Sequence, residues 1–248
     1  GPVAQISFPD AAEFFPVITR SPEEEQNEFY PMKTFADHDY DPDRLGRILP
    51  IVDSVEWVTK LASHPFIDDI QLRIKGVGDA EKIKEIIKKC QNICLLGNTR
   101  LWVNDHWEAA VDVGCFGVHV GQEDLYKCAQ AGGLKMIEEK GMALGVSVHS
   151  YAELAAALGV KPSYISLGPI FPTKSKDVKF DPQGIEFITK FRKLIPAEVP
   201  FMVIGGIGNA GAARLARLAG ADSVAVIGAI TEAEDIFEAI SEINDAML

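Results

Sequence analysis

From residue 47 onward, short apolar runs alternate with longer segments in which apolar residues recur every three or four positions. The apolar runs have the length of buried strands, and the segments between them have the period of amphipathic helices. We expect eight strands, over residues 48–53, 67–75, 101–105, 117–120, 143–148, 164–170, 201–207 and 223–230.

Three of the helical segments have recognisable features. Residues 80–90 carry isoleucines at helical spacing, residues 151–158 follow Ser150 as an N-cap, and residues 209–218 follow a strand that ends in glycines. Eight successive β-α units predict an α/β protein whose parallel strands close into a (β/α)8, or TIM, barrel. An open, doubly wound sheet is the alternative, and it rarely needs eight units this short and regular.

Residues 1–46 differ from the rest of the chain, because they combine several prolines and an acidic run with no sustained apolar period. We expect an acidic, proline-containing N-terminal extension or linker over residues 1–46 and a barrel domain over residues 47–248. The 248 residues of the chain suit one barrel of this kind. No second domain is required.

The formal net charge is −12. It argues against nonspecific binding to nucleic acid or to an anionic membrane, because those partners select basic surfaces. The sequence predicts neither a membrane span nor a signal peptide, so a cytoplasmic location is expected. The four cysteines lack the spacing of a zinc site or a disulfide framework, which indicates reduced thiols.

Charged residues end the second apolar run. Period-two alternation is expected to place Gln71, Arg73 and Lys75 on one face, pointing into the barrel. Two inward cations in an acidic protein indicate either an anionic ligand or matching carboxylates on neighbouring strands. These residues alone favour the two interpretations equally.

Carboxylates and hydroxyls end the next three strands. Asn104 and Asp105 end the third strand, Asp124 follows the fourth, and Ser147 lies near the end of the fifth. Asp105 and Asp124 could share one magnesium ion, which binds through one or two carboxylates plus phosphate oxygens. Helix capping by Asp124 and a hydrogen bond at the barrel rim for Asp105 are the alternatives.

The histidines give a weaker signal. His119 is interpreted as an interior residue with satisfied hydrogen bonds, because no second histidine falls at metal-binding spacing. His106 and His149 are candidates for hydrogen bonds to a substrate. None of the three is included in the predicted catalytic set.

The sixth strand opens into a loop with hydroxyls and a lysine, Thr173, Ser175 and Lys176, which suits phosphate recognition. The last two strands end in glycine-containing stretches that include Gly206 and Gly228. Glycine lets backbone amides approach a ligand closely, and a phosphate site after strands seven and eight recurs in these barrels. The sequence therefore predicts a second anion site at this part of the rim.

Together, these motifs resemble the thiamin-phosphate synthase family. The matching stretches are Gln-Leu-Arg-Ile-Lys at 71–75, Val-Asn-Asp-His-Trp at 103–107, Gly-Val-His-Val-Gly-Gln-Glu-Asp-Leu at 117–125, Gly-Val-Ser-Val-His-Ser at 145–150, Leu-Gly-Pro-Ile-Phe-Pro-Thr-Lys-Ser-Lys at 167–176, Pro-Gln-Gly at 182–184, Ile-Gly-Gly-Ile at 204–207 and Ser-Val-Ala-Val-Ile-Gly-Ala-Ile at 223–230. The resemblance runs from Ile48 to the C-terminus, in order and with the family's spacing.

The resemblance implies a transferase of thiamin biosynthesis. It implies that 4-amino-2-methyl-5-hydroxymethylpyrimidine diphosphate and thiazole phosphate give thiamin phosphate and pyrophosphate. The sequence offers no activated nucleophile. None is needed if the C–O bond to diphosphate breaks first, with magnesium assisting, and the thiazole nitrogen captures the resulting pyrimidine methylene cation.

By resemblance, the site residues take the following roles. The diphosphate is held by Arg73, Lys75, Asn104 and Lys176, with Mg2+ on Asp105 and Asp124. Ser147 lies beside the reacting methylene, and Gln71 lies near the pyrimidine. The thiazole phosphate is held at Thr173, Ser175, Gly206, Ile227 and Gly228. The catalytic set is Arg73, Lys75, Asn104, Ser147 and Lys176.

The chain departs from the family pattern in three places: His106 and Trp107 follow Asn-Asp where arginine is common, Ser175 replaces a threonine, and Gly228 replaces a serine. A thiazole tautomerase-like enzyme and a non-catalytic phosphate-sensing barrel are the rival functions. Retention of the charged set disfavours both. The sequence leaves open a homo-oligomer and fusion to an upstream domain of the thiamin pathway.

Overall fold

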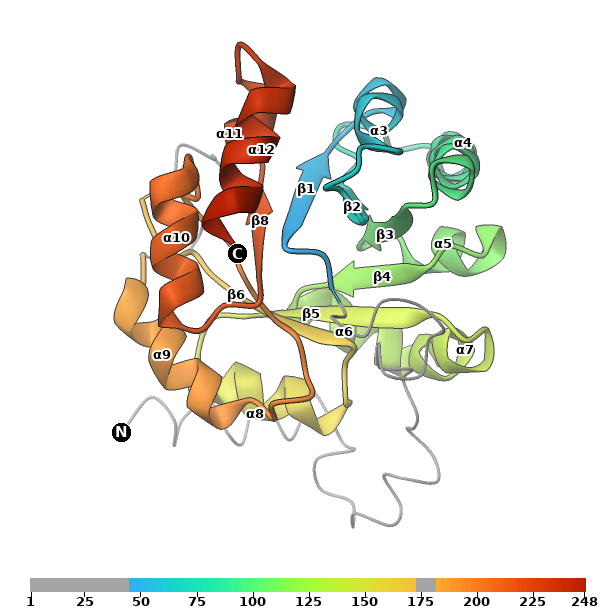
Figure 1. Cartoon of the computed structure of the whole chain (residues 1–248). Coiled ribbons are helices and arrows are strands. Elements are labelled where there is room, and N and C mark those ends of the chain that lie inside the picture. The colour runs from blue at the N-terminus through green and yellow to red at the C-terminus, as the bar shows by residue number, and fades with distance from the viewer. Residues whose placement is uncertain (1–44, 173–181) are drawn as a thin grey trace.

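The computed structural model of the chain describes residues 45–172 and 182–248. Within these ranges, eight parallel strands close into a barrel in which each strand pairs with the next and β8 pairs with β1 (Figure 1). The strands are β1 (Ile48–Val52), β2 (Asp69–Leu72), β3 (Arg100–Asn104), β4 (Gly117–Val120), β5 (Ala143–Val148), β6 (Tyr164–Leu167), β7 (Phe201–Val203) and β8 (Ser223–Val226). The predicted barrel is confirmed. The extension predicted over residues 1–46 lies almost wholly outside the described residues, so that boundary stays a prediction.

Helices surround the barrel on its outer face (Figure 1). They are α3 (Val55–Leu61), α4 (Ala80–Gly97), α5 (Trp107–Val113), α6 (Gln122–Gln130), α7 (Gly133–Glu139), α8 (Tyr151–Gly159), α9 (Ile185–Leu194), α10 (Ala210–Ala219), α11 (Gly228–Thr231) and α12 (Ile236–Ala246). Ser150 caps α8 as predicted, because its hydroxyl accepts a hydrogen bond from the Glu153 amide. In the described part of the chain, every helix is too short or too polar to span a bilayer.

Several strands end earlier than predicted, because the chain leaves the sheet as soon as it reaches the rim. β2 ends at Leu72, so Gln71 lies within the strand and Arg73 and Lys75 follow it. Arg73 still donates its backbone amide to the Val52 carbonyl at 2.8 Å, and its position is therefore fixed by β1. Arg73 and Lys75 thus lie at the rim, just past the end of β2.

Two hydrophobic cores result from the alternation along the strands. The larger lies between the sheet and the helices, and includes Leu72, Val103 and Val146. The smaller fills the barrel interior and includes Trp102 and Tyr164.

Glycines on neighbouring strands make room for the two large interior rings. Trp102 pairs with Gly117 in register, and Tyr164 pairs with Gly145. A Cβ at Gly117 would lie 2.5 Å from the Trp102 ring, and one at Gly145 would overlap the Tyr164 ring. Only glycine lets the barrel close around these aromatics.

The end of the barrel where the strands begin is held by buried polar contacts. Asp69 accepts hydrogen bonds from the Arg100 guanidinium, the Trp102 indole and the Gly46 amide, at 2.7 to 2.9 Å. Asp69 itself is fully buried. This network joins β2 and β3 to the segment that enters β1, and leaves the opposite mouth for the predicted site.

Candidate active site

Polar side chains line the barrel interior at the ends of four successive strands. Gln71, His119 and Ser147 come from β2, β4 and β5, and Asn104 is the last residue of β3. The register pairs Asn104 with His119. Parallel strands bring these residues to one mouth, where ligands bind in barrels of this type.

Two carboxylates meet beside this interior layer. Asp105 follows β3 and Asp124 lies in the first turn of α6, whose N-cap is Gly121. Burial and the nearby Asp124 carboxylate, which also hydrogen-bonds Asp105, together raise the pKa of Asp105 to about 7 against the opposing effect of Arg73. Asp124 is not the N-cap of α6, since Gly121 occupies that position, but its first-turn location also suits a favourable interaction with the helix N-terminus.

Asp105 also has an unusual backbone conformation. Its φ angle is +66°, in the left-handed region that few residues other than glycine adopt. Its amide donates to the His119 carbonyl at 2.9 Å, which fixes the conformation. A strained residue held in this way at a strand end is typical of a functional position.

Arg73 and Lys75 line a cavity of about 130 Å3 at the rim between β1, β2 and β8. Its other lining residues include Asp53, Trp57 and Thr231. Ile227, predicted for the thiazole phosphate, also lines it. The cavity therefore connects the predicted diphosphate residues with one predicted residue of the second anion site.

The interior histidine is hydrogen-bonded on both sides. His119 Nε2 lies 2.6 Å from Ser147 Oγ, and His119 Nδ1 lies 2.5 Å from Tyr164 Oη. Burial, assisted by the positive charge of Arg73, lowers the pKa of His119 to about 4, so the ring is neutral at physiological pH. The sequence interpretation of His119 as a satisfied interior residue is confirmed.

Gln71 is buried, and its amide nitrogen makes no hydrogen bond to residues 45–172 or 182–248. It lies close enough to the Tyr164 phenol to lower that group's pKa, against the larger raising effects of burial and Asp69. A buried donor without a partner is unfavourable unless a ligand completes it. Gln71 thus marks the interior end of the site.

The rim after β6 and β7 is held together by backbone hydrogen bonds. Phe171 donates its amide to Gly205 O at 2.9 Å, and a Cβ at Gly206 would lie 2.5 Å from the Pro172 carbonyl oxygen. Gly206 has a φ of +71°, which favours glycine.

Thr173, Ser175 and Lys176 lie outside the described residues. Gly228, expected within a strand, instead begins the short helix α11.

The structure thus brings Arg73, Asp105 and Asp124 together and places Ser147 on the same mouth. Pattern reasoning missed Gln122, whose side-chain amide donates to the Ser147 carbonyl at 3.0 Å, and Tyr164. Alternation inside β4 could have indicated the inward direction of His119, but nothing local identifies Tyr164 as its partner.

No group of three or more His, Cys, Asp or Glu side chains suited to a metal occurs in the described ranges. A pair of carboxylates does occur, and Mg2+ needs no more from the protein when phosphate oxygens complete its shell. The mutual repulsion that raises the pKa of Asp105 would be relieved by a cation between the two groups. The residues present therefore fit this ion.

Comparisons with known proteins identify the family of the chain. A family model described as thiamine monophosphate synthase matches residues 48–230. The thiamine-phosphate synthase of Citrobacter koseri is 38% identical over 202 residues, covering 82% of this chain and 92% of that protein. The homologue from Serratia proteamaculans is 41% identical over 194 residues, covering 78% and 87%.

Solved structures give the same result. The thiamine phosphate pyrophosphorylase of Pyrococcus furiosus superposes with a TM-score of 0.67 at 26% identity, covering 82% of this chain and 95% of that one. A 3-hexulose-6-phosphate synthase, with a TM-score of 0.61 at 18% identity, covers 82% of this chain and 100% of its own, and shares the fold alone. The chain belongs to the thiamine monophosphate synthase family.

Proposed function

We propose that this protein joins hydroxymethylpyrimidine diphosphate to thiazole phosphate, giving thiamin phosphate and pyrophosphate. The observation that carries the proposal is the gathering of Arg73, Asp105 and Asp124 at the mouth that also holds Ser147. A cation and a carboxylate pair at one mouth suit a diphosphate with a divalent ion. Family membership supports the same reaction.

The diphosphate is assigned to Arg73, Lys75, Asn104 and Lys176, with Mg2+ on Asp105 and Asp124. When bound, the ion supplies positive charge to the diphosphate oxygens. Arg73 and Lys75 add charge from the cavity that they line. Asn104 contributes an amide that already reaches toward Asp105, at 3.4 Å. Lys176 lies outside the described residues, and its role rests on the resemblance.

The reaction is proposed to begin with cleavage of the C–O bond to diphosphate. The electron pair of that bond leaves with the diphosphate, and the thiazole nitrogen then donates its lone pair to the pyrimidine methylene cation. The protein stabilises the negative charge that develops on the leaving group and holds the second substrate in line. No protein nucleophile is required.

The pyrimidine is assigned to the interior end of the site, against Gln71 and Ser147. Gln71 has a buried donor that a ring nitrogen of the substrate would complete. The thiazole phosphate is assigned to Thr173, Ser175, Gly206, Ile227 and Gly228. The last of these begins a short helix after β8, the place where barrels of this type often bind phosphate.

A cytoplasmic location, self-association and fusion to an upstream domain of the thiamin pathway remain predictions. The mass of the native polypeptide would test the fusion, and sedimentation of the purified protein would test self-association. Neither bears on the chemistry proposed for the barrel.

Purified protein supplied with both substrates and Mg2+ tests the proposed function. We expect equal amounts of pyrophosphate and thiamin phosphate. Arg73→Ala should lower kcat/KM by about 10²–10³, the usual effect of removing one group that stabilises developing charge. Lys89→Ala is the matched control, because Lys89 is an exposed cation on α4 that pairs with Glu85. Folded wild-type protein without product would reject the synthase function.

A further inference from the structure

A chain of buried hydrogen bonds crosses the barrel interior from the proposed active site to β6. Ser147 Oγ contacts His119 Nε2 at 2.6 Å, and His119 Nδ1 contacts Tyr164 Oη at 2.5 Å. His119 is 6% exposed and Tyr164 is fully buried. Ser147 is the member of the chain at the substrate end, while the other two lie inside the barrel.

The direction of the chain follows from the groups that can donate. A neutral imidazole donates from one nitrogen and accepts at the other. The phenol of Tyr164 has its own proton to donate, and His119 Nδ1 is an acceptor 2.5 Å from the phenol oxygen. Nδ1 therefore accepts, Nε2 carries the ring proton, and that proton is donated to Ser147 Oγ.

The serine hydroxyl is then left with its own proton to donate. Its oxygen already accepts from His119, so the O–H bond must turn toward another acceptor. The mouth of the barrel, where the diphosphate is assigned, is the side open to it, because Ser147 is only partly buried. Without His119, the hydroxyl would rotate among several directions.

We propose that His119 is a positioning residue, which holds the Ser147 hydroxyl so that its proton points at an oxygen of the departing diphosphate. This inference rests on the proposed function and adds to it two residues, His119 and Tyr164. Its effect belongs to the transition state, since the hydrogen bond strengthens as negative charge develops on the leaving oxygen.

Packing around Tyr164 fixes the phenol beside His119 Nδ1. Its ring stacks on His119 with centroids 5.6 Å apart and meets Trp102 edge-on at 4.8 Å. On the neighbouring strand, Gly145 leaves the space that the phenol occupies. Gly145→Ala would displace the phenol and disturb the chain without altering any of its polar groups.

A double-mutant cycle between positions 119 and 147 tests the proposal. His119→Phe keeps a ring of similar shape but no nitrogen. We expect it to lower kcat about 10-fold to 100-fold with each KM changed less than about threefold, because the lost interaction is made in the transition state. In a Ser147→Ala background the same change should lower kcat less than about twofold, since His119 then has no hydroxyl to hold.

Two further variants keep the test decisive. His119→Gln places an amide nitrogen near the position of Nε2 and should recover part of the lost kcat. Tyr164→Phe removes only the phenol oxygen, and its smaller loss of kcat should also vanish in the Ser147→Ala background. Met202→Leu, in the same interior core, is the packing control and should leave kcat unchanged. Melting temperatures of all variants identify any that fail to fold.

The proposal would be overturned if the fold-losses in kcat from His119→Phe and Ser147→Ala multiplied in the double variant, because the two residues would then act independently. A separate readout does not depend on activity: 15N spectra of histidine-labelled wild-type protein, assigned with His119→Gln, should show the neutral form with the proton on Nε2. A proton on Nδ1 would also overturn it. Wild-type protein that forms no product would reject the synthase function instead, so the two failures are distinguishable.

Discussion

At the scale of single residues, the site depends on groups whose ordinary preferences are not met in the free protein. Asp105 has a left-handed backbone and a carboxyl beside a second carboxylate. Gln71 has a buried amide nitrogen without a hydrogen bond in residues 45–172 and 182–248. All three features cost stability, and a ligand of the proposed kind would relieve the carboxylate repulsion and the unpaired donor.

The first prediction concerns the pH dependence of stability without metal. The pKa of Asp105 is about 7 in the folded protein against 3.8 ordinarily, so the unfolded chain releases this proton at lower pH. The associated stability is fully present below about pH 4 and is lost as the pH rises through about 7. Melting temperatures measured in EDTA should therefore fall more steeply over this window in wild type than in Asp105→Asn.

Magnesium provides the complementary measurement. Because the ion requires both carboxylates ionised, Mg2+ should raise the melting temperature of wild type more at pH 8 than at pH 5.5. Asp105→Asn should respond little at either pH. An equal response in wild type and variant would remove Asp105 from the metal site.

The second prediction concerns Gln71. Gln71→Met replaces the amide with an apolar side chain of similar length, so the free protein should keep or gain stability, by roughly 0–2 kcal/mol. The same change should lower kcat/KM for the pyrimidine substrate about tenfold, since one hydrogen bond to it is lost. Urea unfolding and steady-state kinetics measure the two effects, and a destabilised variant with normal kinetics would contradict the assignment.

At the scale of elements, the barrel interior is fitted by pairing large rings with glycine across neighbouring strands. Trp102 of β3 occupies the space that Gly117 of β4 leaves, and its indole is fixed by a 2.9 Å hydrogen bond to Asp69. Tyr164 of β6 and Gly145 of β5 repeat the arrangement closer to the site. Strand register and interior packing therefore depend on each other.

The third prediction tests this pairing. Gly117→Ala would place a Cβ 2.5 Å from a Trp102 ring that has little freedom to move. We expect a loss of about 1–3 kcal/mol in the free energy of unfolding, the usual effect of overpacking a core. Gly78→Ala is the control, because that position is exposed and its Cβ would meet nothing within 4 Å. Equal stability of the two variants would contradict the prediction, because it would show that the barrel interior accommodates a Cβ beside Trp102 at no cost in free energy.

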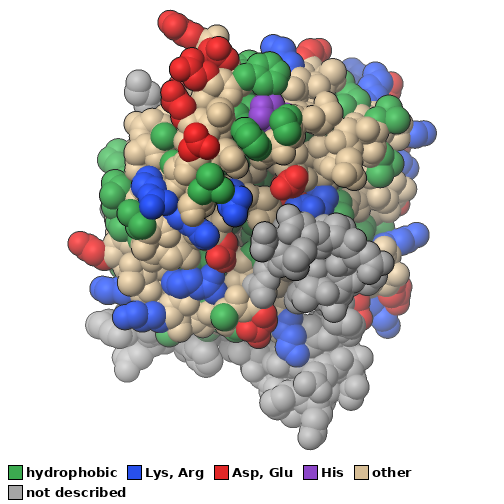
Figure 2. Space-filling model, in the orientation of Figure 1, with side chains coloured by type: hydrophobic (Ala, Val, Ile, Leu, Met, Phe, Trp, Pro, Cys, Tyr) green, Lys and Arg blue, Asp and Glu red, His purple; other side chains and the backbone are tan. Residues whose placement is uncertain are grey.

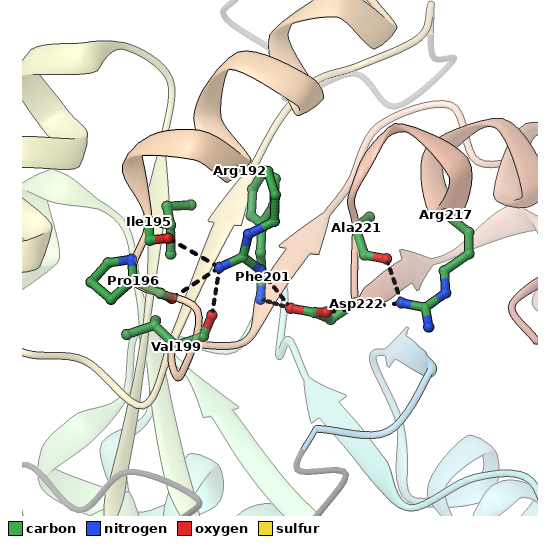
Figure 3. Close-up of polar contacts among 8 residues, drawn as sticks. All are labelled: Arg192, Ile195, Pro196, Val199, Phe201, Arg217, Ala221 and Asp222. Atoms are coloured by element: carbon green, nitrogen blue, oxygen red, sulfur yellow. Dashed lines mark hydrogen bonds and ion pairs between the residues drawn. The ribbon is translucent and has the colours of Figure 1, made fainter.

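At the scale of the whole molecule, one end of the barrel carries stabilising contacts and the opposite end carries the proposed site. Arg192 of α9 donates to Asp222 at 2.8 Å and to the carbonyls of Ile195, Pro196 and Val199, as Figure 3 shows. Asp222 also accepts from the amide that begins β7. These contacts lie where strands begin, opposite the proposed site, and join α9, β7 and β8.

Surface charge is also divided between regions. Figure 2 shows acidic side chains gathered over α11 and α12 and basic ones over α9 and α10. The net charge of −12 would repel anionic substrates from most of the surface. Attraction must therefore come from the local cations of the site, Arg73 and Lys75 among them.

The fourth prediction separates the two ends. Arg192→Met keeps the apolar part of the side chain but leaves three carbonyls and a carboxylate without this donor. We expect a loss of about 1–3 kcal/mol in stability, from partly buried groups left without partners. kcat should stay unchanged at a temperature well below the melting transition. A large fall in kcat with an intact fold would contradict the separation of the stabilising end of the barrel from the end with the proposed site.

The sequence by itself determined the number of strands, their order and the kind of residue at each strand end, because apolar periodicity and turn residues act over a few positions. It placed Asp105, Asp124 and Ser147 at rim positions for the same reason. It could not fix where β2 ends, since that depends on the rim that β1 and β2 share.

Only the tertiary structure decided which side chains meet. His119 and Tyr164 are 45 residues apart, and the barrel's register brings them together. The raised pKa of Asp105 likewise requires burial and the closeness of Asp124, neither of which a local pattern contains. Strand patterns are local, whereas contacts across a closed barrel depend on how all its strands are paired.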